Sequence, residues 1–338
     1  MPKSNDPNEV VLFFTGGTIC MRPTEQDRGL VPSGDFQRLL EELRKEHLGD
    51  VHLRPVLWSD LPSPAMTPEN MFNLSMELNK VLAEPGVRGA VVVHGTDTLA
   101  ESAFLADLLV TVPKPVVFTG AMRFYTETGF DGIRNLINAI YACLQPLPPE
   151  TGVVLQMADL IFQAREVTKV NSLNVNPFEA PGTGAIGYVV GDTIVLTRPP
   201  ARRPGPDRKL FANPALEPHV PLISCFTGMD GSIIELIRSQ GLAGLVIAGF
   251  GAGNVPPGVV PSLEALVKDN IPVVLTTQCL EGGVWPLYGY PGGGEDLHKR
   301  GVIMGGRLSA AKARLQLMVA LGVTRDMNII REIFNSGD

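Results

Sequence analysis

Two apolar runs, each ending in a glycine-threonine turn, decide how this chain folds: VVLFFTGGTI at residues 10–19 and AVVVHGTDTLAE at residues 90–101. Continuous runs of Val, Leu and Phe are typical of strands that are buried on both faces of a parallel sheet. Gly16, Gly17 and Gly95 allow the backbone after each run to adopt tight turns, so that hydroxyl and carboxylate side chains can enter one crevice. We therefore expect the chemistry of the protein at the carboxyl ends of these two strands.

Apolar runs and helical patterns alternate along the rest of the chain. Residues 35–47 carry apolar side chains at helical spacing, and Thr67-Pro68-Glu69 supplies a cap, a first-turn proline and an acid for another helix. Two more helical patterns close the chain at 309–322 and 324–335. Strand-like runs are expected at 10–15, 89–94, 115–119, 152–157, 187–197, 220–225, 243–249 and 271–276. The alternation predicts an α/β fold of parallel sheets flanked by helices.

The alternation stops at RPPARRPGPDRKLFANPALEPH, residues 198–219. This segment is rich in proline and charged residues and shows neither the helical nor the strand periodicity of apolar residues. Such a composition is typical of a linker. The chain has 338 residues, a length that suits two domains of ordinary size. We therefore expect a larger N-terminal catalytic α/β domain over 1–197, the linker over 198–219 and a smaller C-terminal α/β domain over 220–338.

The composition favours a small-molecule partner. A formal net charge of -7 argues against a surface for nucleic acid or for an anionic membrane. The N-terminal MPKSNDPNEV is polar and has no apolar signal region, and no uncharged run reaches the ~18 residues of a membrane span, so a cytoplasmic protein is expected. The 4 cysteines and 5 histidines have neither the spacing of a zinc site nor that of a disulfide framework, so we expect thiols and no metal.

Two glycine-rich segments have part of a dinucleotide-binding motif in the wrong context. GTGAIG at 182–187 matches G-x-G-x-x-G but leads into a strand pattern, whereas that motif opens a helix. GFGAGN at 249–254 follows a strand but lacks the third glycine. We interpret both segments as turns and expect no cofactor, with an NAD-dependent enzyme kept as an alternative.

The HGTDT turn carries more polar side chains than a helix start requires. Thr98 and Glu101 have the spacing of a capping box. Because one cap needs one side chain, Thr96 and Asp97 are left for another role. The N-terminus of the helix that follows also offers N–H groups and positive potential to an oxyanion or a substrate carboxylate.

Five motifs follow one another along the chain: TGGTI at 15–19, HGTDT at 94–98, PVVFTGAMR at 115–123, DGIRNL at 131–136 and REVTKVN at 165–171. Together they resemble the ordered signature of the bacterial-type asparaginase/glutaminase family, and the cytoplasmic type is the most similar branch. GAGN at 251–254 and the final pair of helices extend the resemblance through the chain. Five motifs in the expected order are far more specific than any one of them.

The resemblance implies that Thr18 is the nucleophile and that Thr96, Asp97 and Lys169 form a charge-relay set. A threonine hydroxyl is a weak nucleophile until it loses its proton, which explains the need for helpers. Burial against Thr96 would favour a neutral Lys169 amine, while pairing with Asp97 would favour the ammonium, and both remain open. Lys169 could also be an ordinary strand-end lysine, and Cys20 is an alternative nucleophile although no histidine lies near it in the sequence.

The resemblance also implies substrate-binding positions. Ser63 matches a serine that the family uses to hold the α-carboxylate of the substrate, and Gly95 and Ala121 are assigned to substrate binding with it. The family precedent is a homodimer or a dimer of dimers, in which Asn254 is expected to reach a neighbouring subunit's site. Pro64 stands where relatives often carry a polar side chain, so recognition of the α-amino group is left open.

A second departure from the family lies in the segment 19–32. Many relatives carry a tyrosine where this chain has Leu30, which cannot relay a proton. The segment mixes charge, Pro and Gly without periodicity, so we expect a loop that closes over the site as a lid, with a plain surface loop as the alternative. Three tyrosines could replace the missing one: Tyr125, Tyr288 and Tyr290. Each of them could equally be an ordinary packed residue.

These features predict an amidohydrolase that converts L-asparagine to L-aspartate and ammonia through a threonine acyl-enzyme. The same residues could act on glutamine, D-asparagine or a β-aspartyl compound, and Pro64 and Leu30 favour this alternative. A non-catalytic small-molecule-binding protein is the third interpretation. The presence of two threonines, an aspartate and a lysine argues against this interpretation, because binding alone does not require a nucleophile and its helpers.

Overall fold

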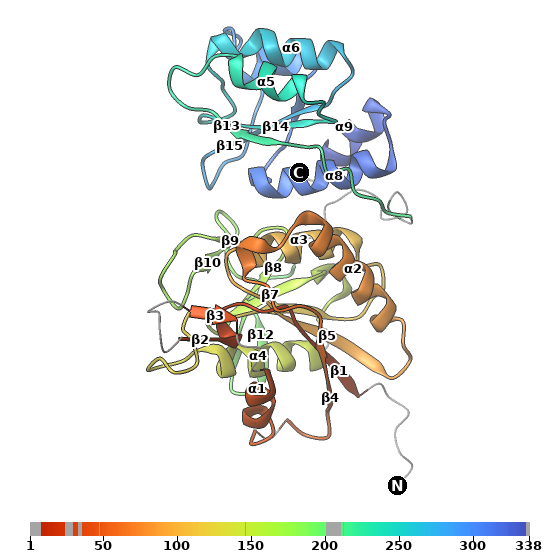
Figure 1. Cartoon of the computed structure of the whole chain (residues 1–338), viewed down its shortest axis with the longest axis vertical. Coiled ribbons are helices and arrows are strands. Elements are labelled where there is room, and N and C mark those ends of the chain that lie inside the picture. Colours follow the sequence, from red (N-terminus) through yellow and green to blue (C-terminus); the bar gives the residue numbers. More distant parts are fainter. Residues whose placement is uncertain are drawn as a thin grey trace. The chain divides into compact units, whose positions relative to one another are not determined.

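The chain divides into two compact units, Met1–Arg203 and Pro204–Asp338, each with its own sheet (Figure 1). The predicted linker over 198–219 stays a prediction, because residues 201–210 and 212 lie outside the described residues. For 21–23 and 30–32 only the backbone is described. The computed structural model describes residues 8–23, 30–32, 36–46, 48–145, 147–200, 211 and 213–335.

An eight-stranded sheet forms the centre of the first unit. Its strands are β1 (Glu9–Phe14), β4 (His52–Leu57), β5 (Val87–Val93), β6 (Val116–Thr119), β7 (Val154–Met157), β8 (Leu160–Gln163), β11 (Gly187–Val190) and β12 (Thr193–Leu196). They lie in the order β12-β11-β8-β7-β6-β5-β1-β4. The five strands from β4 to β7 are parallel, whereas β8, β11 and β12 pair antiparallel.

Helices cover both faces of this sheet, which explains the continuous apolar runs of β1 and β5. Figure 1 shows α2 (Pro68–Leu82) and α3 (Leu99–Leu109) on one face, and α1 (Phe36–Leu43) and α4 (Gly132–Leu144) on the other. Val11 and Phe13 of β1 belong to the apolar cluster beneath α2 and α3, while Val10 and Leu12 belong to the opposite cluster. Alternate residues of β1 thus pack into two hydrophobic cores, one on each face of the sheet.

A parallel α/β architecture is confirmed, two local expectations differ from the structure, and strand β4 was not expected from the sequence. The run 187–197 is not one strand but the hairpin of β11 and β12, which turns at Gly191 with φ +62°. The helix expected over 35–47 ends at Leu43. Strand β4 has no continuous apolar run and contains Pro55, which an edge strand tolerates because it pairs on one side only.

The cap predicted at Thr67 is confirmed, with Asn70 as its partner. The Thr67 hydroxyl accepts the backbone N–H of Asn70, and the Asn70 side chain accepts the backbone N–H of Thr67. Pro68 occupies the first turn as expected. Helix α2 therefore begins where the sequence indicates.

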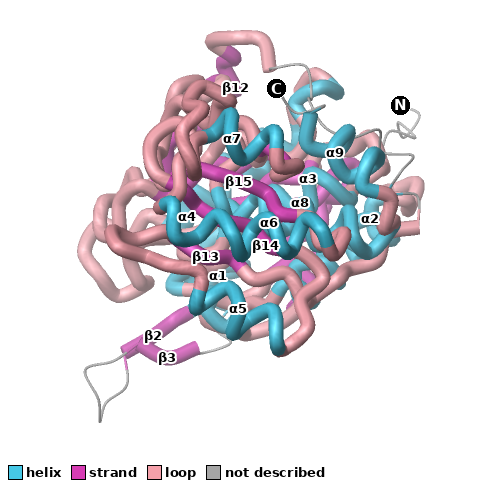
Figure 2. The backbone as a smooth tube through the Cα atoms, turned by 90° about the horizontal axis from the view of Figure 1, so that it is seen from above, coloured by secondary structure: helices cyan, strands magenta, loops and turns pink. Residues whose placement is uncertain are grey.

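The second unit is a smaller α/β layer structure with a parallel sheet in the order β13-β14-β15-β16. Figure 1 shows α5 and α6 on one face of it and α8 and α9 on the other, and Figure 2 shows β13, β14 and β15 side by side. Its elements are β13 (Leu222–Ser224), α5 (Ser232–Ser239), β14 (Leu245–Gly249), α6 (Val260–Lys268), β15 (Val273–Thr277), α7 (Gly294–Lys299), β16 (Ile303–Met304), α8 (Ala310–Val323) and α9 (Met327–Asn335). The two helices predicted at the end of the chain are confirmed as α8 and α9.

Short elements complete the first unit. Two small antiparallel hairpins pair β2 (Met21–Pro23) with β3 (Leu30–Pro32), and β9 (Thr168–Lys169) with β10 (Phe178–Glu179). Single 3-10 turns lie at Thr18–Cys20, Ser63–Ala65 and Pro149–Thr151, and a further one at Pro257–Val259 belongs to the second unit. In the described part of the chain, no helix has the length and apolar character to cross a membrane.

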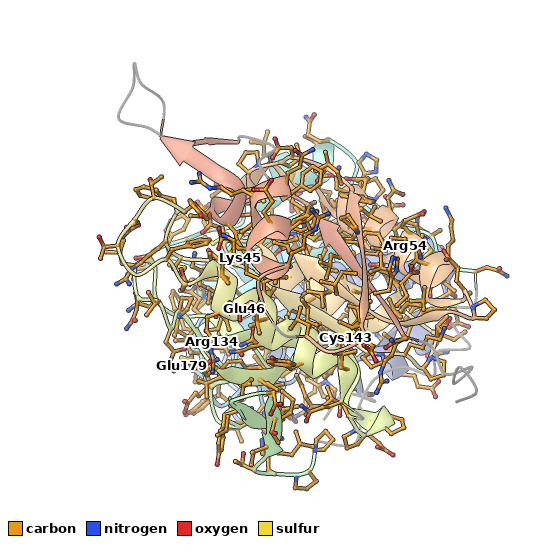
Figure 3. The ribbon with its side chains drawn as sticks, turned by 90° about the horizontal axis from the view of Figure 1, so that it is seen from below. Lys45, Glu46, Arg54, Arg134, Cys143 and Glu179 are labelled. Atoms are coloured by element: carbon orange, nitrogen blue, oxygen red, sulfur yellow. The ribbon has the colours of Figure 1, made fainter. Side chains whose placement is uncertain are left out.

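The cysteines are thiols, as expected. Cys20, Cys143 and Cys225 are buried, and Cys279 is exposed. Cys143, labelled in Figure 3, lies at the end of α4, where its Sγ would be 2.4 Å from a Cβ on Gly89. Burial raises the pKa of this thiol to about 12, so Cys143 acts as a packing residue.

Candidate active site

The turn after β1 contacts two other segments through close approaches that only glycine allows. Gly16 has φ +106° and Gly17 has φ +90°. A Cβ on Gly16 would lie 2.4 Å from the carbonyl oxygen of Leu61, and one on Gly17 would lie 2.4 Å from the Cα of Gly95. The first glycine-threonine turn, which ends at Thr18, is therefore packed directly on the second.

The second turn begins where β5 ends and is held by Ser63. The backbone N–H of His94 donates to the carbonyl of Thr119 at 2.8 Å, which keeps the turn beside the end of β6. The backbone N–H of Asp97 donates to Ser63 Oγ at 3.2 Å, and the Thr98 hydroxyl donates to the Ser63 carbonyl at 2.9 Å. Ser63 thus ties the turn to the 3-10 helix at 63–65.

The capping box expected from Thr98 and Glu101 is wrong. Thr98 does occupy the N-cap position of α3, but its side chain makes no cap hydrogen bond. Its hydroxyl donates to the carbonyl of Ser63 instead. The hydroxyl thus makes a tertiary hydrogen bond instead of a local capping bond, and a tertiary partner cannot be recognised from the spacing of residues in the sequence.

Lys169 reaches the second turn from the β9–β10 hairpin. Phe178 of β10 pairs with Lys169 and is fully buried in the core beneath α2 and α3, so it anchors the hairpin. Lys169 Nζ lies 2.9 Å from Thr96 Oγ1 and 2.7 Å from Asp97 Oδ1. The lysine side chain is 18% exposed and that of Asp97 is 58% exposed. Solvent therefore reaches the carboxylate of this ion pair, while protein atoms largely cover the amine.

These turns surround a cavity of about 330 Å³, near the lower limit of small-molecule sites. Five of the predicted site residues line it: Thr18, Ser63, Thr96, Asp97 and Lys169. The charged lining residues are Lys169 and Asp97, one of each sign. With Ser172, which also lines it, the cavity thus offers four hydroxyls, a cation and an anion to a small polar ligand.

The other predicted site residues are placed differently. Gly95 lies behind the cavity, where a Cβ would come within 2.7 Å of the Ser63 side chain. Ala121 is 1% exposed and precedes Met122, which does line the cavity. Asn254 belongs to the second unit, where it closes the tight turn after β14 by donating its backbone N–H to the Phe250 carbonyl at 2.9 Å.

Sequence reasoning missed four lining residues: Gly17, Pro62, Met122 and Ser172. Gly17 and Met122 lie in quoted motifs, and Met122 could have been found because it follows the carboxyl end of β6, next to β5 in the sheet. Pro62 directly precedes Ser63. Ser172 follows β9 in an irregular turn, and no signal in the sequence marks it.

His94 is buried beside the site without entering it. Burial lowers its pKa to about 4, so the imidazole is neutral near neutral pH. Its Nδ1 lies 2.8 Å from the Gly95 carbonyl and its Nε2 lies 2.9 Å from Ser102 Oγ. Because a carbonyl can only accept, Nδ1 carries the hydrogen and Nε2 accepts from the serine hydroxyl.

The residues proposed to replace the family's tyrosine do not line the cavity. Tyr125 packs on Phe130, with ring centroids 5.2 Å apart, and Arg38 lies 3.8 Å above its ring. Tyr288 and Tyr290 belong to the second unit, where their rings are 5.5 Å apart. The lid predicted over 19–32 lies partly outside the described residues, which omit 24–29 and the side chain of Leu30.

Two further expectations can be compared with the site. Cys20 is buried and is absent from the cavity lining, which does not favour it as a nucleophile. Within the described ranges, no three His, Cys, Asp or Glu side chains gather in a way that could hold a metal ion.

Comparison with known proteins matches nearly the whole chain to one family. Residues 9–202 match the family described as "Asparaginase, N-terminal", and residues 219–334 match "Glutaminase/Asparaginase C-terminal domain". A probable L-asparaginase of Deinococcus radiodurans is 36% identical over 97% of this chain and 97% of its own, and an L-asparaginase of Bacillus licheniformis is 33% identical over 93% and 95%. The crystal structure of a probable cytoplasmic L-asparaginase from Campylobacter jejuni has a TM-score of 0.81 at 29% identity and covers 97% of this chain and 99% of that one.

Proposed function

Because the chain belongs to the asparaginase family, we propose that it hydrolyses the side-chain amide of L-asparagine to L-aspartate and ammonia. The relatives described above are named L-asparaginases. The observation that carries the proposal is the position of Lys169 Nζ, which is within hydrogen-bond distance of Thr96 and Asp97 in a cavity that Thr18 also lines. A nucleophile, a proton acceptor and a group that orients the acceptor are the parts that acyl transfer needs.

In the first half of the proposed reaction, Thr18 Oγ attacks the side-chain amide carbon of the substrate. Its proton passes through the Thr96 hydroxyl to the Lys169 amine, along the 2.9 Å contact between Nζ and Thr96 Oγ1. Asp97, at 2.7 Å, then stabilises the ammonium that forms. The tetrahedral intermediate collapses by breaking its carbon–nitrogen bond, and the departing nitrogen takes a proton back and leaves as ammonia.

In the second half, water attacks the ester carbon of the acyl-enzyme. The same relay takes a proton from this water, and the ester bond breaks to release L-aspartate and restore the Thr18 hydroxyl. No cofactor takes part in this proposal. Each half places one proton on Lys169 and removes it again, so the enzyme returns to its starting state.

Substrate binding is assigned to the polar wall beside the relay, where Ser63 contacts Asp97. Ser63 Oγ accepts the N–H of Asp97, so its own hydrogen is free to bind the α-carboxylate of the substrate. The N-terminus of α3, eleven residues long, directs its positive end to the same turn. Gly95 and Ala121 shape the backbone of the two turns, and Asn254 is proposed to complete a neighbouring subunit's site in a homodimer or a dimer of dimers.

The second candidate is a related amidase that acts on glutamine, D-asparagine or a β-aspartyl compound. Pro64 favours it, because this residue lines the cavity and offers no polar side chain and no N–H to an α-amino group. Ammonia release from L-asparagine, D-asparagine and glutamine, and amine release from a β-aspartyl compound, measured without added cofactor, distinguish the two candidates. Release from none of them would instead support a non-catalytic binding protein.

The acyl-enzyme has its own test. Hydroxylamine intercepts an ester intermediate and gives a hydroxamate in competition with water. If L-asparagine and the β-methyl ester of L-aspartate pass through one Thr18 ester, both must give the same ratio of hydroxamate to aspartate. Ratios that differ between the two substrates would contradict a common acyl-enzyme.

Compartment and linker are also proposals. We propose a cytoplasmic enzyme, supported by the name of the Campylobacter jejuni structure, and cell fractionation tests it. We also propose that residues 198–219 connect the two units, supported by the two family matches, which end at 202 and resume at 219. Limited proteolysis tests the linker, because cleavage there should give two resistant fragments.

A further inference from the structure

Asp131 begins α4, yet its carboxylate serves another segment. It occupies the N-cap position of this helix but makes no side-chain cap hydrogen bond. Its Oδ2 instead accepts the backbone N–H of Met122 at 3.1 Å, and its Oδ1 accepts that of Arg123 at 3.0 Å. Two backbone N–H groups on one carboxylate form a charge-assisted pair of hydrogen bonds, stronger than a neutral one.

Asn135, one turn further along α4, continues the same network. The residue is 2% exposed, and both its side-chain nitrogen and its side-chain oxygen have hydrogen-bond partners. Its Nδ2 donates to the Gly120 carbonyl at 3.0 Å and to Asp131 Oδ2 at 3.0 Å, and its Oδ1 accepts the N–H of Ala158 at 3.1 Å. Both ends of segment 120–123 are thereby fixed to the start of one helix.

The segment that these two side chains hold forms a wall of the cavity. Met122 lines the cavity directly. Gly120 supports the second turn from behind, since a Cβ there would lie 2.4 Å from the His94 carbonyl oxygen and 3.3 Å from Thr96 Cγ2. A shift of segment 120–123 would therefore change the shape of the cavity beside Thr96, whereas Lys169, which contacts Thr96 and Asp97, belongs to a different segment.

We propose that Asp131 and Asn135 are positioning residues for substrate binding, which act by fixing segment 120–123 and with it Met122. The inference rests on the proposed function, because it assigns the wall that they fix to the substrate cavity. Thr18, Ser63 and Lys169 come from other elements of the fold. Loosening segment 120–123 therefore weakens substrate binding and leaves the chemical step nearly intact.

The test is Asp131→Asn in the full chain, with steady-state kinetics on L-asparagine. An amide has the shape of the carboxylate, but only its oxygen can accept, so one of the two N–H groups loses its partner and faces an NH₂ group. We expect KM to rise about tenfold and kcat to stay within about threefold of wild type. The control is Arg134→Gln on the same helix (Figure 3). The Arg134 side chain pairs with Asp159 at 3.0 Å and, among the described residues, has no hydrogen bond to segment 120–123.

A double-mutant cycle with Met122→Ala separates positioning from general destabilisation. If Asp131 acts through the placement of Met122, the effect of Asp131→Asn on KM must shrink when residue 122 is alanine. Additive effects on KM would overturn the inference, as would a folded Asp131→Asn enzyme with an unchanged KM. If Asp131→Asn does not fold, Asp131→Ser keeps a good N-cap residue for α4 and removes the carboxylate, and the same outcomes apply to it.

A wild-type protein that releases no ammonia from L-asparagine would refute the proposed function instead. Hydrogen exchange then still tests the contact that carries the inference. The amides of Met122 and Arg123 should exchange faster in Asp131→Asn than in Arg134→Gln. Equal exchange in the two variants would show that the carboxylate does not hold the segment.

Discussion

Replacing Lys169 with methionine is expected to separate catalysis from stability. Methionine keeps most of the apolar stem and removes Nζ, so Thr96 and Asp97 lose one partner each. Asp97 is 58% exposed and remains hydrated by water, which limits the loss to the ~0–1 kcal/mol of a solvent-exposed ion pair. In a domain of this size, that loss lowers Tm by only about 2–4 °C.

The effect on turnover is expected to be far larger. A positioned proton acceptor contributes roughly 10²–10⁴-fold to an acyl transfer, equivalent to about 3–5 kcal/mol in the barrier. Lys169→Met should therefore reduce kcat for L-asparagine by about that factor while KM changes little, because the lysine is assigned to the proton and not to the substrate. Coupled detection of ammonia measures kcat and KM, and calorimetry measures Tm.

Lys80→Met is the matched control. Lys80 forms an ion pair of similar length, 2.9 Å with Glu77, on the exposed side of α2. It should behave as wild type in kcat. The relay assignment would be refuted by a Lys169→Met enzyme that keeps more than about a tenth of wild-type kcat, since no general base contributes so little.

Four more predictions follow from the same site. Thr18→Ala should abolish ammonia release with an unchanged circular dichroism spectrum, and substantial residual activity would exclude Thr18 as nucleophile. Thr96→Ala and Lys169→Met should each remove most of kcat and the double variant little more, whereas additive losses would show that they do not share one proton transfer. Because burial lowers the pKa of His94 to about 4, below its unfolded value of 6.5, its protonation favours unfolding. Its stabilising contribution, present above pH 6.5, should fall by about 3 kcal/mol as pH drops to 4, and urea titrations should show this loss in wild type but not in His94→Gln. Since Pro64 cannot bind an α-amino group, and a lost hydrogen bond to a charged group weakens affinity by about ten- to hundredfold, kcat/KM should discriminate poorly between L-asparagine, D-asparagine and α-amino-blocked asparagine if Asp97 does not bind that group; a preference for the L-form by several hundredfold would show that Asp97 replaces the contact.

The interior of the fold was predictable because burial on both faces imposes a continuous apolar run. VVLFF at 10–14 and AVVV at 90–93 are such runs, and they form the neighbouring strands β1 and β5. The edges were less predictable, because an edge strand pairs on one side and accepts polar residues and proline. β4 with Pro55 was missed for this reason, and the hairpin of β11 and β12 was taken for one strand because the short turn at Gly191 interrupts the apolar run only briefly.

The site was predictable where motifs follow parallel strands. Thr18 and Thr96 come after adjacent strands, so the topology brings them to one cavity. Lys169 lies on a strand of only two residues, which is too short to show a periodic pattern in the sequence. Only the resemblance to a family indicated a role for this lysine. The role of Asp131 could not be read from sequence, because an aspartate at a helix start predicts a cap, whereas here the carboxylate binds a segment nine residues earlier.

On the proposed mechanism, substrate recognition and proton transfer meet at Asp97. Its Oδ1 binds Lys169, while its backbone N–H binds Ser63 Oγ, the group assigned to the α-carboxylate of the substrate. A carboxylate has about four lone-pair sites, and that of Asp97 is 58% exposed, so it can bind an α-ammonium group together with the lysine. Pro64 provides neither a side-chain acceptor nor a donor at this wall, which leaves Asp97 as the anionic residue among those that line the cavity. Losing the Asp97 carboxylate should therefore raise KM and lower kcat together, whereas the loss of Lys169 lowers kcat alone.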